Sequence, residues 1–235
     1  MVESTGLTLF WSHAVGVIIS ESVAKDGVIS EIDFINRGSE VRSGMWMIIV
    51  KGNTAAEILK NKVKLNEVSS FHLDDIIKSG EALSQSTDSK VYTFIDAISS
   101  KGKSATVAAV KNEFSSSAIT PHLNGSAVFK SDKLVGYLDG DETQYMIMIK
   151  NKTKEGLITL KNVSGSNTSI TLEIFSSKTK LTPLYNNGRV SLIIDIYPVV
   201  GINEVEGTKD FIKEENLKIL RGEAEKKSRT HTVFN

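Results

Sequence analysis

The residues that most resemble a chemical motif lie between Ala97 and Ser104, where the chain reads AISSKGKS. This is a relaxed version of the P-loop, in which backbone amides and a lysine bind nucleotide phosphates and a hydroxyl holds Mg²⁺. Asp195 closes the apolar run that starts at Ser191 and would hold the magnesium ion, as the acid of a Walker B strand does. Lys103, Ser104 and Asp195 therefore give the hypothesis of a nucleotide-binding protein.

The pattern around this loop argues against phosphate binding. A P-loop follows a strand and precedes a helix, whereas the residues before Ala97 have helical spacing and include Asp96. Gly102 is the single glycine of the loop, and Asp195 lies inside an apolar run that continues through Tyr197. We therefore favour a flexible loop of serine, glycine and lysine after a helix, and keep nucleotide binding as the alternative.

Metal binding has a weaker signal. The four histidines are His13, His72, His122 and His231, and no two of them have the spacing that places both imidazoles on one metal ion. His72 is followed by two aspartates, Asp74 and Asp75, but on a short polar helix such a group predicts a solvated face. The prediction is therefore that the protein has no metal site and needs no cofactor.

Hydrolytic and calcium chemistry are also disfavoured. The acidic run from Leu138 to Thr143 lacks the spread of ligands over about 12 residues that a calcium loop requires. It predicts the start of a helix near Asp141 instead. Ser126 lacks the second glycine of a nucleophile elbow. We therefore predict a protein that is not an enzyme, with no catalytic, cofactor-binding or metal-binding residue.

Composition excludes further classes. The chain has 235 residues, with 28 basic and 28 acidic side chains and no cysteine. Zero net charge and the interleaved acids and bases of Lys209 to Arg229 disfavour nucleic acid as a partner, and the lack of thiols excludes disulfides and iron–sulfur clusters. The apolar run from Leu7 to Ile19 is shorter than the about 20 residues of a membrane span, and Met1 to Gly6 lacks the bases of a secretory leader. These features predict a soluble polypeptide without an anchor.

In the first half of the chain, apolar spacing predicts helices around one buried strand. The helices are expected over residues 28–37, 55–60, 71–79 and 91–99, with Thr54 and Glu57 able to cap the second. The continuous apolar run from Met45 to Val50 predicts a strand covered on both faces. The run from Ala105 to Val110 fits a helix or a strand. Composition changes after residue 115, and we place a domain boundary between residues 117 and 118.

The second half is predicted to form three hairpins followed by a helix. The strand pairs are expected over residues 126–130 with 134–138, 157–160 with 169–175, and 178–185 with 189–197, and the helix over 208–229. The predicted fold class is therefore α+β: a small multi-domain protein with mixed or antiparallel sheets and flanking helices. Residues 1–117 would form the N-terminal part, and residues 118–235 a domain of successive hairpins plus a long helix.

Ordered blocks in this sequence resemble one known family. They are Gly125-Ser-Ala-Val-Phe-Lys-Ser-Asp-Lys-Leu-Val-Gly136, Glu142-Thr143, Ser169-Ile-Thr-Leu-Glu-Ile-Phe-Ser-Ser-Lys-Thr-Lys180 and Glu206-Gly207, with looser agreement in Glu21 to Gly27 and Met45 to Gly52. Over roughly residues 7–228 the chain resembles the C subunit of bacterial spore germinant receptors, the GerA-type C (Ger(x)C) lipoproteins.

The resemblance implies a non-enzymatic binding and assembly module that acts in spore germination with A and B membrane subunits. It also implies attachment by lipid to the outer face of the spore inner membrane, although the family's signal peptide and lipid-bearing cysteine are absent from this sequence. Against the family pattern both ends look short, so we expect the N-terminal part to be incomplete at its start and the C-terminal domain at its end.

Overall fold

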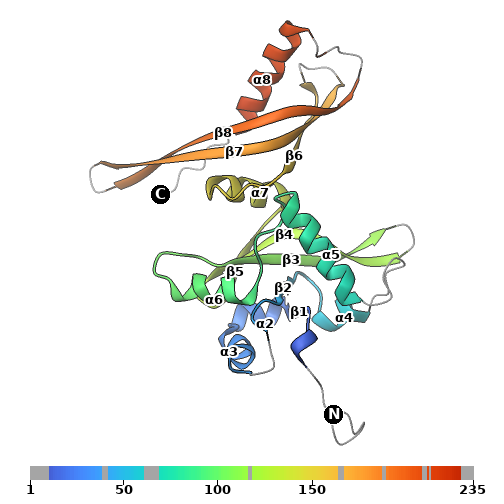
Figure 1. The fold of residues 1–235 in the computed structure, drawn as a ribbon, viewed down its shortest axis with the longest axis vertical. Helices are drawn as coiled ribbons and strands as arrows, with labels where there is room; N and C mark the ends of the chain where they lie inside the picture. The colour runs from blue at the N-terminus through green and yellow to red at the C-terminus, as the bar shows by residue number, and fades with distance from the viewer. Residues whose placement is uncertain are drawn as a thin grey trace, which may run out of the picture. The chain divides into compact units, whose positions relative to one another are not determined.

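The computed structural model describes residues 11–38, 42–60, 69–115, 118–163, 167–186, 189–207, 211 and 213–228. These residues form two compact units (Figure 1). The first unit comprises Met1–Glu81 and Gln85–Thr143, and the second comprises Ala82–Ser84 and Gln144–Asn235. Helices and strands alternate in the first unit and segregate in the second, so the α+β fold class predicted from the sequence is confirmed.

The first unit is built on a mixed five-stranded sheet. Its strands follow the order β1 (Gly16–Ser20), β2 (Trp46–Val50), β3 (Thr106–Ser115), β4 (Ala118–Lys130) and β5 (Lys133–Leu138). The first three strands are parallel, and β3, β4 and β5 are joined as antiparallel hairpins. Parallel neighbours need long crossovers, and helices supply them here.

Helices cover both faces of this sheet. One face packs against α2 (Glu21–Asp26), α3 (Ile29–Arg37) and α6 (Val91–Ser99), and the other against α4 (Ala55–Lys60) and α5 (Ser69–Ala82). Every residue of β2 is buried because its alternate side chains enter the two cores in turn. The predicted doubly covered strand is therefore confirmed, as are the four predicted helices, with ends that shift by a few residues.

Reciprocal capping explains where two helices begin. At α4 the Thr54 hydroxyl accepts from the Glu57 amide at 3.2 Å, and the Glu57 carboxylate accepts from the Thr54 amide at 2.7 Å. Asp139 and Glu142 make the same pair of bonds, at 2.8 and 2.9 Å, at the start of α7 (Gly140–Ile149). Each box satisfies amides that have no partner inside the helix, so the helix predicted near Asp141 is confirmed.

Three features of the first unit were not predicted, or were left open, by the sequence analysis. A short helix, α2, precedes the predicted one, and the ambiguous run after Ala105 is a strand, β3. The compact units divide between Thr143 and Gln144, because the register that pairs Thr106 with Val128 joins β4 to the N-terminal sheet. The boundary placed between residues 117 and 118 lies between β3 and β4, and it stays a prediction about domain organisation.

The second unit contains a three-stranded antiparallel sheet. β6 (Gly156–Leu160) pairs with β7 (Ser169–Asn186), and β7 pairs along its length with β8 (Arg189–Glu206). The second and third predicted hairpins are thus confirmed, with β7 serving both; their connecting residues 164–166 and 187–188 lie outside the described residues. The predicted long helix is seen as α8 (Glu214–Ser228), which packs through Leu220 against Leu172 and Ile170.

Candidate functional site

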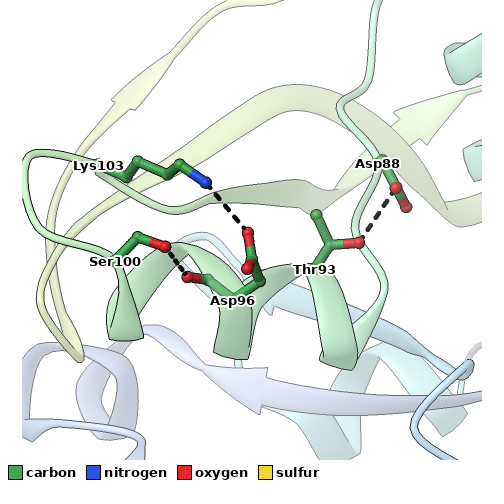
Figure 2. Close-up of polar contacts among 5 residues, drawn as sticks. All are labelled: Asp88, Thr93, Asp96, Ser100 and Lys103. Atoms are coloured by element: carbon green, nitrogen blue, oxygen red, sulfur yellow. Dashed lines mark hydrogen bonds and ion pairs between the residues drawn. The ribbon is translucent and has the colours of Figure 1, made fainter.

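The P-loop-like segment has the reverse of the required order. It follows α6, which ends at Ser99, and precedes β3 (Figure 2). The Lys103 ammonium lies 3.3 Å from the Asp96 carboxylate, and the Ser100 hydroxyl donates to the Asp96 carbonyl at 2.7 Å. A phosphate site needs amides at a helix N-terminus, whereas this loop sits at a helix C-terminus. Asp195 lies mid-strand in β8 opposite Lys180, in the other unit. Nothing in the described residues supports the nucleotide-binding alternative.

Replacing Lys103 by Met tests this conclusion. Both members of the Lys103 and Asp96 pair are more than half exposed, so the loss should change the free energy of unfolding by less than about 1 kcal/mol. Calorimetric titration with MgATP should give no binding heat for either the wild type or the variant. A wild-type binding isotherm that disappears in K103M would restore the nucleotide-binding hypothesis.

Two of the histidines that the structure describes make hydrogen-bond contacts within the first unit. The His72 Nε2 lies 3.3 Å from the Pro121 carbonyl, and the His122 Nε2 lies 2.9 Å from the Thr120 hydroxyl. His231 is outside the described residues. Within the described part of the chain, no group of three or more histidine and acidic side chains is placed to hold a metal ion.

Ser126 cannot act as a nucleophile from its position. The residue is fully buried in β4, and its hydroxyl has no hydrogen-bond partner among the described residues. No substrate can reach such a group without unfolding of the sheet around it. The missing elbow glycine and the burial of the side chain therefore both argue against Ser126 as a nucleophile.

Asp74 makes a partly buried contact with Trp46 that the sequence did not indicate. Its carboxylate accepts from the Trp46 indole at 2.7 Å and pairs with the Lys78 ammonium at 2.7 Å. The Lys90 ammonium lies 2.9 Å from the centroid of the Trp46 ring, a cation–π contact. Asp74 therefore anchors α5 to β2, and is not part of a solvated face. The spacing of Asp74 and Lys78 was the one available sign, because it predicts an ion pair on a helix.

The pH dependence of stability tests the Asp74 contact. Burial raises the pKa of Asp74, but the hydrogen bonds from Lys78 and Trp46 outweigh it, and the net pKa is lowered. A lowered folded-state pKa means that the ionised group stabilises the fold above the unfolded pKa of about 3.9, and that this stability is lost as pH falls through the folded value. As Asp74 becomes protonated, between roughly pH 5 and 3, the free energy of unfolding of the wild type should fall. We expect that of Asp74→Asn to fall less steeply over the same range. Lys78→Met should give an intermediate slope in urea denaturation series, and equal slopes for wild type and Asp74→Asn would contradict the contact.

Residues in the blocks that carry the family resemblance have structural tasks. Gly125 has a φ of 67°, and a Cβ there would collide with the Leu138 carbonyl of β5. Gly207 has a φ of 142° and packs against the Thr168 side chain. The Glu21 carboxylate accepts from the Gly52 amide at 2.9 Å and so joins α2 to the loop after β2. Gly125, Gly207 and Glu21 therefore help to set the shape of the chain in these blocks.

A groove in the second unit is a candidate binding surface. It has a volume of about 770 Å³. Its floor is formed by β-strand residues that include Leu172, Val200 and Ile202, and its walls by Met148 of α7 and Leu217 of α8. Leu217 and Ile202 are 41% and 42% exposed, although both are large apolar side chains. Exposed apolar surface of this kind marks a site of contact with another apolar surface.

Charged side chains stand at the rim of this groove and not in its floor. Glu214, Lys218, Arg221 and Glu225 of α8 contribute both signs. An apolar floor with a rim of mixed charge is the composition of a protein interface. It offers no convergent set of polar groups that would orient a small polar ligand. The arrangement therefore fits an apolar protein segment.

Family models match both parts of the chain. The model described as "Spore germination protein N-terminal domain" matches residues 1–112, and the one described as "Spore germination B3/ GerAC like, C-terminal" matches residues 124–232. Among curated proteins, the chain is 24% identical over 189 residues to spore germination protein B3 of Bacillus subtilis (strain 168), covering 77% of this chain and 48% of the relative. It is 20% identical over 218 residues to spore germination protein GerQC of Bacillus cereus, covering 91% and 59%.

A solved structure supports the fold. The crystal structure of the GerBC protein superposes with a TM-score of 0.55 at 19% sequence identity, covering 96% of this chain and 68% of that one. The chain spans about half the length of the curated relatives that it matches. None of the helices in the described ranges combines the length and apolar character needed to cross a membrane. Both family models together cover most of the residues, and the chain belongs to the GerAC-like spore germination family, the C subunits of germinant receptors.

Proposed function

We propose that this protein is a non-enzymatic binding and assembly module of a nutrient germinant receptor, and that it acts by contact with the receptor's A and B membrane subunits. The family supplies the process, spore germination. The contact surface proposed is the groove between α8 and the sheet of the second unit. The site of action proposed is the outer face of the spore inner membrane.

The observation that carries the proposal is the exposed apolar lining of the groove. Leu217 projects from α8 into the groove with 41% of its surface exposed. Burying such side chains against a partner contributes about 25 cal/mol per Å² of apolar surface. An exposed apolar groove with charged residues at its rim supports contact with another protein as the activity.

Spore germination in the host tests the proposal. Deleting the gene in a strain without a redundant receptor should abolish nutrient-triggered germination, and the wild-type gene should restore it. Leu217→Glu places a charge in the apolar groove and should fail to restore germination. Ile219→Glu is the matched control, because Ile219 is equally exposed on α8 but does not line the groove. Normal germination of the deletion strain, or full restoration by Leu217→Glu, would contradict the proposal.

A further inference from the structure

The outer edge of β7 is protected at three places. β6 pairs with it from Ile170 to Ile174. Beyond β6, the Asn151 side chain accepts from the Thr179 amide at 2.6 Å and donates to the Thr179 carbonyl at 2.9 Å. Pro183 follows, and a proline has no N–H to offer a partner strand. Such devices prevent unwanted pairing of sheet edges.

The outer edge of β8 has no matching protection between Val190 and Ile196. β8 is the last strand of its sheet, and no described strand pairs with its outer side. Thr179 lies opposite Ile196 and directs its N–H and C=O away from β8, toward Asn151. In an antiparallel pair of strands, when one residue directs its N–H and C=O away from the partner strand, the residue opposite does the same. By the alternation along the strand, the residues of β8 with outward amides are Val190, Leu192, Ile194 and Ile196.

The residues with outward amides carry apolar side chains, which share one face of the sheet and are exposed there at Val190, Leu192 and Ile194. Val190 is 69% exposed, Leu192 47% and Ile194 36%. They lie opposite Tyr185, Pro183 and Leu181 of β7 in the register of the hairpin. A two-stranded ribbon is marginally stable in water unless a further strand or a helix joins it, and β6 extends no further than Ile174.

We propose that a second copy of this chain pairs antiparallel along β8 from Val190 to Ile196, with the two-fold axis at Ile193. The pattern of the segment, VSLIIDI, reads nearly the same in both directions. In this register Val190 lies opposite Ile196 of the second copy, and Leu192 opposite Ile194. These cross-strand pairs are apolar on both chains and stabilise a sheet.

Charge and chain geometry fit the same register. Asp195 lies opposite Ser191 of the second copy, and Arg189 opposite Tyr197, so no like charges meet. Pro198 ends the run of outward amides at one end, and β8 begins at Arg189 at the other. A two-fold interface uses the same patch on both subunits, which this palindromic segment provides. An interface of this length is small, so we expect a weak dimer.

Cysteine cross-linking tests the register, because the wild-type chain has no cysteine. In the proposed dimer Ile193 faces Ile193 of the second copy in a non-hydrogen-bonded pair, with Cα atoms about 4.5 Å apart, which suits a disulfide. The full chain carrying Ile193→Cys should form a disulfide-linked dimer under mild oxidation. Thr182→Cys is the control, since Thr182 is the β7 neighbour of Ile193 and would lie roughly 14 Å from its counterpart; it should not cross-link.

Sedimentation of proline variants tests the edge itself. Ile194→Pro removes an outward amide of β8 and should weaken self-association by about tenfold or more. Leu181→Pro removes the outward amide directly opposite, on β7, and should leave self-association unchanged; circular dichroism checks that both variants fold. A wild type that stays monomeric up to millimolar concentration, equal cross-linking of both cysteine variants, or dimers that survive Ile194→Pro would each overturn the inference. It concerns two copies of this chain and not the membrane subunits, although Ile196 of the paired segment also lines the groove.

Discussion

Replacing Phe129 by Ala is expected to lower the free energy of unfolding by about 4 kcal/mol, a large effect for a single residue. Phe129 is fully buried in β4, and its ring meets the Phe94 ring of α6 edge to face, with centroids 5.0 Å apart. The truncation removes this aromatic contact and leaves a cavity between the sheet and the helix. Urea denaturation followed by circular dichroism measures the loss.

Phe114 offers the matched control for this experiment. It is a phenylalanine on the neighbouring strand β3, but 78% of its surface is exposed. Phe114→Ala should change the free energy of unfolding by less than about 0.5 kcal/mol. Equal losses from the two variants would mean that the core does not lie where β4 and α6 meet.

Replacing Gly125 by Ala is expected to cost about 3 kcal/mol, an unusually large value for the addition of one methyl group. The backbone at Gly125 has a φ of 67°, which favours glycine, and the added Cβ would collide with backbone atoms of Leu138 and Asp139. Backbone cannot move aside as a flexible side chain can, so the β4–β5 hairpin must distort.

Gly136→Ala is the control for Gly125→Ala. Gly136 lies on the same hairpin and does not have a positive φ. A Cβ at this position would meet no other atom within 4 Å. That variant should be as stable as the wild type or slightly more stable. Differential scanning calorimetry of both variants decides the matter, and a Gly125→Ala protein with the wild-type melting temperature would contradict the geometry.

The predictable parts of the fold are those that local chemistry determines. The capping pair Thr54 and Glu57 and the apolar run of β2 gave the right elements, because each depends on neighbours in the sequence. The run after Ala105 remained ambiguous because its strand character comes from long-range pairing with β2 on one side and β4 on the other. Short α2 was missed since a helix of this length, Glu21–Asp26, has little periodicity to detect.

The candidate surface could be predicted less well than the fold. The lysine and serine of the P-loop-like segment can be recognised from the local sequence alone. Whether they bind phosphate depends on whether a strand or a helix precedes the loop. The groove joins side chains from α7, β8 and α8, such as Met148, Val200 and Leu217. No spacing along the chain indicates that these meet. The Asn151 cap on Thr179 likewise requires the tertiary structure.

The proposed function depends on contact between the groove and the receptor's membrane subunits. The direct measurement is affinity purification of the tagged full chain from detergent-solubilised spore membranes, with immunoblots for the A and B subunits. Both subunits should be recovered with the wild type and with Ile219→Glu, and recovery should fall about tenfold or more with Leu217→Glu. No recovery with the wild type, or equal recovery with a folded Leu217→Glu protein, would contradict it.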